Sequence, residues 1–305
     1  MSTITRRDFL HTSAMLFGAT LVAPSYLKRK KERLLSFSTL GCPDWDLQQI
    51  VSFAAAHGYQ GIELRGLQRQ MDLPQSPGFN NAAGIDSTMQ LMKENKLRFV
   101  GLGSSATLHF AAGTERDKNL EDGRRFIDLA EKINCPYVRV FPNNFPADTD
   151  RQITIDRIAD GLLELGNYAQ KKNVTVLMET HGDAVWIADL EKIMSAASHT
   201  HVGLVWDVSN MWTVTKEPVQ DAYQRLKKYI RHTHLKDAAL VNGKLQYKLL
   251  GRGEVPVFNA IAALDEGGYK GFYSFEWEKM WHPELDAPEI ALADFPLAMK
   301  KHKKK

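Results

Sequence analysis

The stretch HTHLKD at residues 232–237 places two of the chain's ten histidines beside a lysine and an aspartate. It has the character of a strand end, and side chains at alternate positions of a strand share one face. His232, His234 and Lys236 would therefore project to the same side, with His232 deepest and Lys236 nearest the end. Imidazole nitrogens can bind a metal or carry protons, and an ammonium group can polarise a substrate oxygen.

Four carboxylates stand at the ends of other short apolar runs: Glu63 in GIELRG, Glu179 in LMETHGD, Asp207 in LVWDVSN and Glu276 in YSFEWE. In two of these runs Met178 and Trp206 occupy the face opposite the carboxylate, and such residues suit burial against helices. The phase of the strands therefore points Glu179 and Asp207 inward.

These residues belong to a repeating pattern of apolar runs and segments of helical period that begins near Leu34. The predicted strands are 35–40, 61–65, 98–103, 137–141, 175–179, 203–207, 231–236 and 272–276. They recur about every 34 residues, which predicts an α/β fold, a single (β/α)8 TIM barrel over residues 34–305. A doubly wound open sheet is the alternative, but no Gly-x-Gly-x-x-Gly turn follows an early strand.

In a parallel barrel the carboxyl ends of the strands meet at one mouth, so Glu179, Asp207, His234 and Glu276 would converge from strands five to eight. Crowded carboxylates repel one another unless protons or a cation neutralise them, and one divalent metal ion would do so. Mainly oxygen ligands with one nitrogen suit Mn²⁺, Mg²⁺ or Co²⁺, and Zn²⁺ less clearly. Each carboxylate alone could instead cap a helix or pair with an arginine or lysine.

Two further inward residues are expected to have structural roles. His232 lies deeper and would support the site through hydrogen bonds rather than bind the metal. Arg139 in VRVF needs a buried carboxylate as its partner. Glu63 or another carboxylate at the mouth could be that partner, so Glu63 is interpreted as either structural or substrate-binding.

The four converging residues, with HTHLKD and the segment GRGEVPVFNAI at residues 251–261, resemble the xylose-isomerase-like superfamily of sugar isomerases and epimerases. The resemblance covers nearly all of residues 34–305. It implies that Glu179, Asp207, His234 and Glu276 hold one divalent metal ion. Of the candidate ions, Mn²⁺ is the one we expect. It also implies that Glu179 and Glu276 move protons on opposite faces of the substrate.

The same resemblance suggests the residues that would contact a carbohydrate substrate. Many sugar epimerases have a histidine three residues after the metal-binding aspartate, where this chain has Asn210, and His181 could supply an imidazole instead. Aromatic side chains after strands one, three, six and eight could support a sugar ring, and they are Trp45, Phe110, Trp212 and Trp281. The expected substrate-binding residues are Glu63, His181, Asn210, Lys236, Glu254, Trp45 and Trp212.

Such a site predicts proton abstraction next to a ketone through a metal-stabilised enediolate. Reprotonation gives epimerisation or aldose–ketose isomerisation, whereas loss of a β-substituent gives dehydration or glycoside cleavage. An isomerase or epimerase of keto sugars or related polyols is the leading interpretation, and a lyase acting on 3-keto glycosides or inososes is the alternative. A nonenzymatic sugar-binding barrel, or a nuclease of this fold, is a third class. The nuclease would need further metal ligands and a basic stripe.

The first 33 residues differ from the rest of the chain. TRRDFL at residues 5–10 precedes the apolar run SAMLFGATLVA, which resembles a twin-arginine export signal. We therefore expect engagement of the twin-arginine machinery, export to the periplasm and no stable membrane span, because the run is short. A surface helix is the alternative interpretation.

Charge and cysteines constrain the remaining expectations. A net charge of +3, much of it terminal, argues against a nucleic-acid partner, and an exported enzyme would meet unphosphorylated sugars. The oligomeric state is left open, a homo-oligomer included. Cys42 and Cys135 fall at opposite ends of the predicted barrel, so both are predicted to be free thiols.

Overall fold

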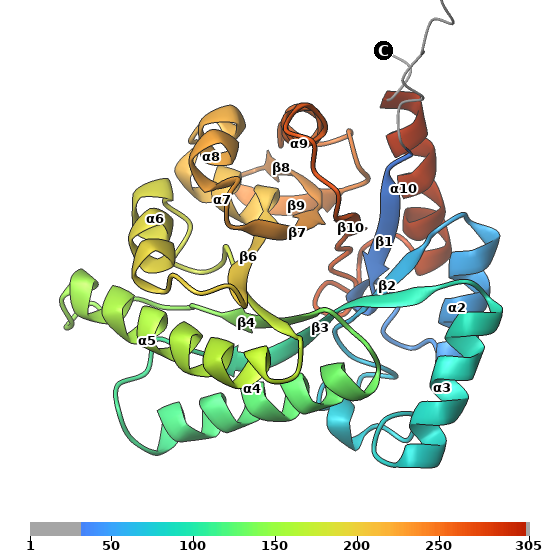
Figure 1. The fold of residues 1–305 in the computed structure, drawn as a ribbon. Helices are drawn as coiled ribbons and strands as arrows, with labels where there is room; N and C mark the ends of the chain where they lie inside the picture. Colours follow the sequence, from blue (N-terminus) through green and yellow to red (C-terminus); the bar gives the residue numbers. More distant parts are fainter. Residues whose placement is uncertain (1–31, 303–305) are drawn as a thin grey trace, which may run out of the picture. The chain divides into compact units, whose positions relative to one another are not determined.

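Eight parallel strands form a closed barrel in the computed structural model, which describes residues 32–302 (Figure 1). The strands are β1 (Leu34–Ser38), β2 (Gly61–Leu64), β3 (Arg98–Thr107), β4 (Tyr137–Phe141), β5 (Thr175–Glu179), β6 (Val202–Asp207), β7 (Ile230–Leu235) and β10 (Phe272–Phe275). Their order is β1-β10-β7-β6-β5-β4-β3-β2, so the first and last strands pair and close the ring. The predicted TIM barrel is confirmed.

Helices follow the strands and surround the barrel (Figure 1). They are α2 (Leu47–Ala56), α3 (Ala82–Glu94), α4 (Thr114–Lys132), α5 (Arg151–Gln170), α6 (Ile187–Ala196), α7 (Val208–Thr215), α8 (Val219–Leu226), α9 (Val257–Glu266) and α10 (Pro288–His302). Asp46, Asn81, Asp150 and Asp207 begin four of them, because each side chain accepts a hydrogen bond from a backbone N–H of the first turn.

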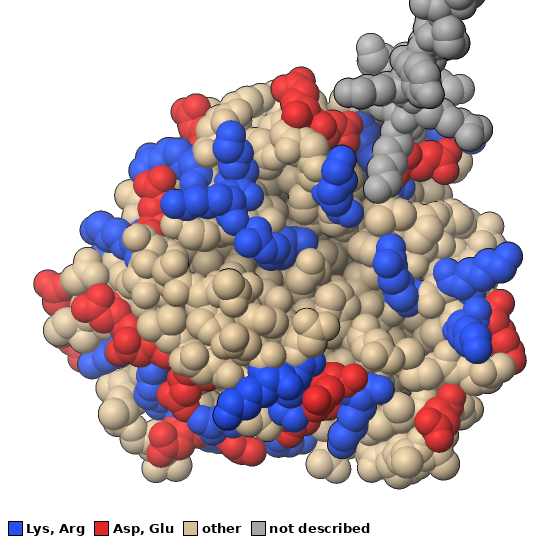
Figure 2. Space-filling model, in the orientation of Figure 1, with Lys and Arg blue, Asp and Glu red and all other residues tan. Residues whose placement is uncertain are grey.

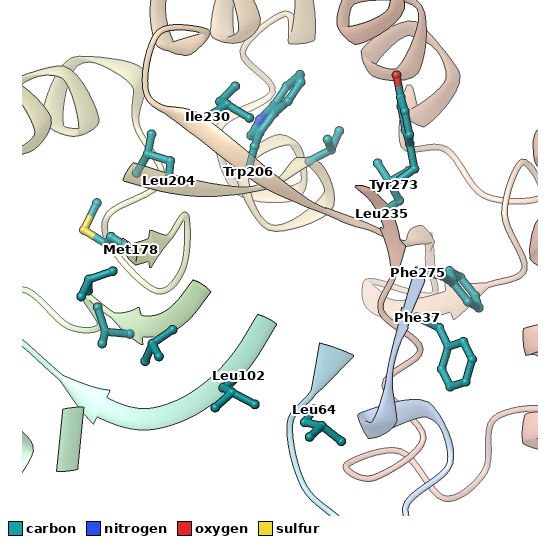
Figure 3. Packing of buried hydrophobic residues seen from close by; sticks show 14 of the residues in the cluster. Phe37, Leu64, Leu102, Met178, Leu204, Trp206, Ile230, Leu235, Tyr273 and Phe275 are labelled. Atoms are coloured by element: carbon teal, nitrogen blue, oxygen red, sulfur yellow. The ribbon is translucent and has the colours of Figure 1, made fainter. Parts of the chain in front are cut away.

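The hydrophobic core lies between the strands and the helices. Met178, Trp206, Leu235 and Phe275 are buried on the outer face of the barrel, where they point toward the surrounding helices (Figure 3). The alternation of strand side chains then turns the neighbouring polar residues toward the barrel axis, as the sequence phase predicts.

An antiparallel hairpin interrupts the βα alternation and was not expected from the sequence. Strands β8 (Asp237–Val241) and β9 (Lys244–Lys248) pair with each other between β7 and α9. Asn242 and Gly243 form its turn with φ of 53° and 73°, a conformation that favours Asn-Gly. The Asp237 carboxylate accepts hydrogen bonds from the backbone N–H groups of Gly251, Gly253 and Val255, so the hairpin is tied to the following loop.

Several other expectations can be placed on the structure. Both cysteines are buried and free, as predicted. The predicted signal peptide and linker, residues 1–33, lie outside the described residues except for Glu32 and Arg33. Within residues 32–302, the longest apolar helical stretches fall short of what a bilayer crossing requires. Acidic and basic side chains are interspersed on the face shown in Figure 2.

Candidate metal centre and substrate cavity

The four residues predicted to bind a metal come together at the ends of β5, β6, β7 and β10. Glu179, Asp207, His234 and Glu276 are all buried, and one ligand atom from each lies within 4.8 Å of the others. His234 Nδ1 is 3.2 Å from Glu179 Oε1, 3.2 Å from Glu276 Oε1 and 3.9 Å from Asp207 Oδ2. The nitrogen that faces the three carboxylates is therefore Nδ1.

Strand register explains this convergence. Asp207 lies opposite His234 between β6 and β7, and Ser274 lies opposite His234 between β7 and β10. Asp207 ends β6 and also caps α7, where its Oδ1 accepts a hydrogen bond of 2.7 Å from Asn210 N. The capping bond occupies one oxygen and leaves Oδ2 directed at the centre.

Glu63 lies beneath the centre rather than in the cavity. Its Oε1 accepts from His234 Nε2 at 2.8 Å, and its Oε2 accepts from His232 Nε2 at 2.8 Å and from Ser274 Oγ at 2.9 Å. Burial raises the pKa of Glu63, but the two imidazoles outweigh burial and hold the pKa well below its usual value. Glu63 thus orients His234, the candidate metal ligand, and His232 holds Glu63.

The buried carboxylate that pairs with Arg139 is Glu179, and the sequence had left this partner open between Glu63 and another carboxylate at the mouth. Arg139 Nε is 3.1 Å from Glu179 Oε2, so Glu179 and not Glu63 balances the buried guanidinium. Its Nη1 also donates to Ser104 O at 2.8 Å. Burial raises the pKa of Glu179, but the charges of His234 and Arg139 outweigh this effect and lower the pKa below its usual value.

Lys236 is buried among three carboxylates. Its Nζ lies 2.8 Å from Asp207 Oδ2, 2.5 Å from Glu276 Oε2 and 2.6 Å from Glu278 Oε1. Burial lowers the pKa of Lys236, but the three acidic neighbours outweigh it and raise the pKa well above its usual value. Glu278 was missed in the sequence, although it stands two residues after Glu276 and so shares its face.

The donor set fits one divalent metal ion. Glu179 Oε2 and Asp207 Oδ2 are fully buried and accept no hydrogen bond, although cationic nitrogens lie within ion-pair distance. Burial raises the pKa of Asp207 to about 7. Both oxygens therefore keep a lone pair free of hydrogen bonds, and three carboxylates with one imidazole are ligands that divalent cations accept.

A cavity of about 410 Å³ opens onto the centre. It is lined by Leu40, Arg65, Arg139, Phe141, Glu179, His181, Asn210, Lys236, Tyr247, Glu276, Glu278, Trp281 and His282. Three predicted substrate-binding residues, His181, Asn210 and Lys236, are therefore at the cavity. Asn210 Nδ2 is buried without a hydrogen-bond partner, and burial lowers the pKa of His181, which favours a neutral imidazole.

The structure does not bring Trp45, Trp212 or Glu254 to this cavity. Trp45 packs on Phe53 with ring centroids 5.0 Å apart, and the ring of Trp212 lies under the Lys216 ammonium group. Glu254 is exposed beside the hairpin. The aromatic lining comes instead from Phe141, Tyr247 and Trp281.

Arg65 is a cavity residue that the sequence reasoning did not select. It is buried, donates to Gly103 O at 3.4 Å and Ser105 Oγ at 3.3 Å, and burial lowers its pKa to about 9. A Cβ atom on Gly103 would lie 2.5 Å from Arg65 Cδ and 2.9 Å from Arg139 Nη2. Glycine at this position of β3 therefore makes room for two guanidinium groups.

Solved structures resemble this barrel closely. The IOLI protein with a bound zinc atom superimposes with a TM-score of 0.73 and 18% identity, covering 88% of this chain and 96% of that one. D-Psicose 3-epimerase from Clostridium cellulolyticum H10 gives a TM-score of 0.71 and 15% identity, covering 89% and 98%. At these identities the likeness shows a shared fold.

Curated relatives and a family model extend the comparison. A 3-dehydroshikimate dehydratase of Bacillus anthracis is 25% identical over 231 residues, which cover 71% of this chain and 78% of that protein. A fructoselysine 3-epimerase of Shigella flexneri is 21% identical over 240 residues, covering 76% and 85%. An inosose dehydratase of Bacillus cereus is 31% identical over 160 residues, covering 45% and 51%. The model of the xylose isomerase-like TIM barrel matches residues 51–295. The chain is an enzyme of the xylose isomerase-like TIM barrel family.

Proposed function

We propose that the protein is a divalent-metal-dependent isomerase or epimerase of a keto sugar or related polyol. The observation that carries this proposal is the convergence of Glu179, Asp207, His234 and Glu276, with two unbonded carboxylate oxygens, at the floor of a cavity. A divalent metal bound by these four residues would supply a Lewis acid that makes the C–H bond beside a carbonyl more acidic.

Glu179 and Glu276 are the proposed proton-transfer groups. Both line the cavity, and each also places one oxygen 3.2 Å from His234 Nδ1, so they reach the same volume from β5 and from the end of β10. Carboxylates on opposite sides of a bound sugar can remove a proton from one face and return one to the other. This transfer inverts one carbon, as an epimerase requires.

Three polar side chains are placed to hold substrate oxygens. Lys236 carries an ammonium group at the cavity wall, His181 presents a neutral imidazole, and Asn210 has a free amide N–H. His181 is fixed by Asn143, whose Oδ1 lies 3.1 Å from the imidazole Nδ1. Because Nδ1 donates to Asn143, the neutral imidazole offers its Nε2 as an acceptor, and Lys236 and Asn210 offer donors to a hydroxylated substrate.

A lyase that uses the same deprotonation is the second candidate. Two of the relatives described above are a 3-dehydroshikimate dehydratase and an inosose dehydratase, and both names denote loss of water. Lys236 could give a proton to a departing oxygen, which would allow 3-keto-glycoside cleavage or inosose dehydration. The two reactions differ only after the first proton has been removed.

Mn²⁺ is the metal we propose. Carboxylate oxygens are hard ligands and an imidazole nitrogen is of intermediate hardness, and this combination suits Mn²⁺. Mg²⁺, Co²⁺ and Zn²⁺ are the alternatives, and zinc is the metal of one similar structure. Each ion in turn would be added to the chelated protein, and the activity that it restores would be measured. Together with the metal content from mass spectrometry, these activities would rank the four ions.

We also propose that the protein is exported to the periplasm by the twin-arginine route. The support is the sequence TRRDFL followed by a short apolar run. Replacing Arg6 and Arg7 with lysine should leave the full-length chain in the cytoplasm. Equal periplasmic amounts of both forms in cell fractions would contradict this route.

The proposed chemistry can be tested by hydrogen exchange. The purified protein with Mn²⁺ would be incubated in D₂O with ketoses, 3-keto glucosides and inososes, and the products followed by NMR. Deuterium incorporation without elimination supports the isomerase or epimerase, whereas released water or aglycone supports the lyase. Glu179→Gln and Glu276→Gln should abolish exchange, and full exchange in either variant would exclude that residue as a proton-transfer group.

A further inference from the structure

A second cavity adjoins the first and has no role in the chemistry described above. Its volume is about 400 Å³, and it lies between strand β9 and the loop of residues 276–287. Tyr247 and His282 line both cavities, so the two recesses are neighbours that share these side chains as a boundary. Their rings meet edge to face with centroids 5.1 Å apart.

The lining of this outer recess combines polar and apolar side chains and is nearly balanced in charge. Arg252 is paired with Asp294 at 2.7 Å, and His282 Nδ1 is 3.2 Å from Glu284 Oε1. Lys248 donates to Gln246 at 3.0 Å. Hydrogen-bonding groups of both kinds therefore face the recess without a strong net charge, which suits a neutral hydroxylated group better than an ion.

Aromatic side chains lie at the boundary of the two recesses. Trp281 lines the inner cavity and remains half exposed, and Tyr247 of the hairpin lines both cavities. Aromatic faces pack well against the apolar side of a sugar ring while the ring's hydroxyl groups bond to polar neighbours. An elongated substrate could thus extend from the metal centre past these rings.

We propose that the outer recess binds the second ring of a keto glycoside, so that the substrate is a glycoside rather than a free keto monosaccharide. This inference rests on the proposed function, because the inner cavity must hold the keto ring. Ligand pockets typically measure about 300–1,000 Å³, so each recess is large enough for one ring and the pair for two. The unexpected hairpin β8–β9 is then the element that builds the second subsite.

The test compares two substrates that differ only in the second ring: methyl 3-keto-glucoside and the matching 3-keto-glucosyl-glucose. The purified protein with Mn²⁺ should show a kcat/KM for C–H exchange about tenfold or more higher with the disaccharide. Gln246→Trp should fill the outer recess and remove this preference. The kcat/KM for methyl 3-keto-glucoside should stay the same. Lys244→Trp, on the same strand but outside the recess, should change neither value.

Two results would overturn the subsite. One is an equal kcat/KM for the two compounds in the unmodified protein. The other is a Gln246→Trp variant in which kcat/KM falls by the same factor for both compounds. If neither compound exchanges hydrogen, the proposed function fails, and the ratio of the two Kd values from titration calorimetry still decides whether a second ring is bound.

Discussion

The carboxylate of Glu63 fixes the orientation of His234, the proposed metal ligand, because it accepts from the Nε2 of both His234 and His232. Glu63→Gln would place an amide N–H against one of these N–H groups and leave His234 free to rotate. Loss of such an outer hydrogen bond typically weakens metal binding by about 10–100-fold. We expect a drop of this size in Mn²⁺ affinity by titration calorimetry. Glu278→Gln, which touches Lys236 instead, is the control, and an unchanged Kd for Glu63→Gln would contradict the role.

Lys236 is the cation that compensates Asp207, Glu276 and Glu278 when no metal is bound. Lys236→Met keeps the length of the side chain but leaves three buried carboxylates short of positive charge. Breaking a buried pair costs about 3–5 kcal/mol, so the free energy of unfolding should fall by this amount in EDTA. Saturating Mn²⁺ should recover part of the loss, as measured by urea unfolding. Lys248→Met is the matched control on the hairpin, and equal stability of Lys236→Met and wild type in EDTA would exclude this compensation.

At the residue scale, the sequence was informative wherever the two-residue period of a strand applied. It placed His232, His234 and Lys236 on one face, and the structure puts them there. It did not select Arg65, although Arg65 stands two residues after Glu63, and the space that Arg65 occupies depends on the glycine at position 103. Nor could it show that Trp45 and Trp212 lie away from the cavity, because Trp45 is in a loop without a fixed period and Trp212 is in helix α7, which the sequence-based interpretation took for a loop.

At the element scale, β3 provides a sharp test of how a strand positions the site. Gly103→Ala would place a Cβ 2.5 Å from Arg65 Cδ and 2.9 Å from Arg139 Nη2, which displaces the guanidinium that pairs with Glu179. Overpacking of this kind lowers the free energy of unfolding by about 1–3 kcal/mol. We expect kcat to fall even under conditions where the variant is fully folded, because Glu179 is displaced. Gly101→Ala on the same face meets only Glu63 Cγ at 3.4 Å, an ordinary contact. Equal kcat in the two variants would show that the arginine pair does not position Glu179.

The elements themselves were predicted unevenly, for a physical reason. All eight barrel strands were found, because buried parallel strands are continuous apolar runs between turns. The hairpin β8–β9 was missed because β9 has no buried residue and β8 is buried only at its first two positions, so neither strand carries such a run. The Asn242-Gly243 pair was its one clear signal, and it went unused.

At the scale of the whole molecule, the barrel and its metal should be thermodynamically linked. A ligand that binds only the folded chain stabilises it by about 2.7 kcal/mol at a concentration of 100 Kd. For a domain of this size, about 1 kcal/mol shifts Tm by roughly 2–4 °C, so saturating Mn²⁺ should raise Tm by about 5–10 °C. The shift should reverse with EDTA and disappear in Asp207→Asn, whose side chain still caps α7 but lacks the charge at Oδ2. Calorimetric scans of both proteins with and without metal make the comparison. A Tm that does not respond to any of the four divalent ions would mean that the convergent carboxylates are neutralised by Lys236, Arg139 and protons alone, and the proposed chemistry would lose its Lewis acid.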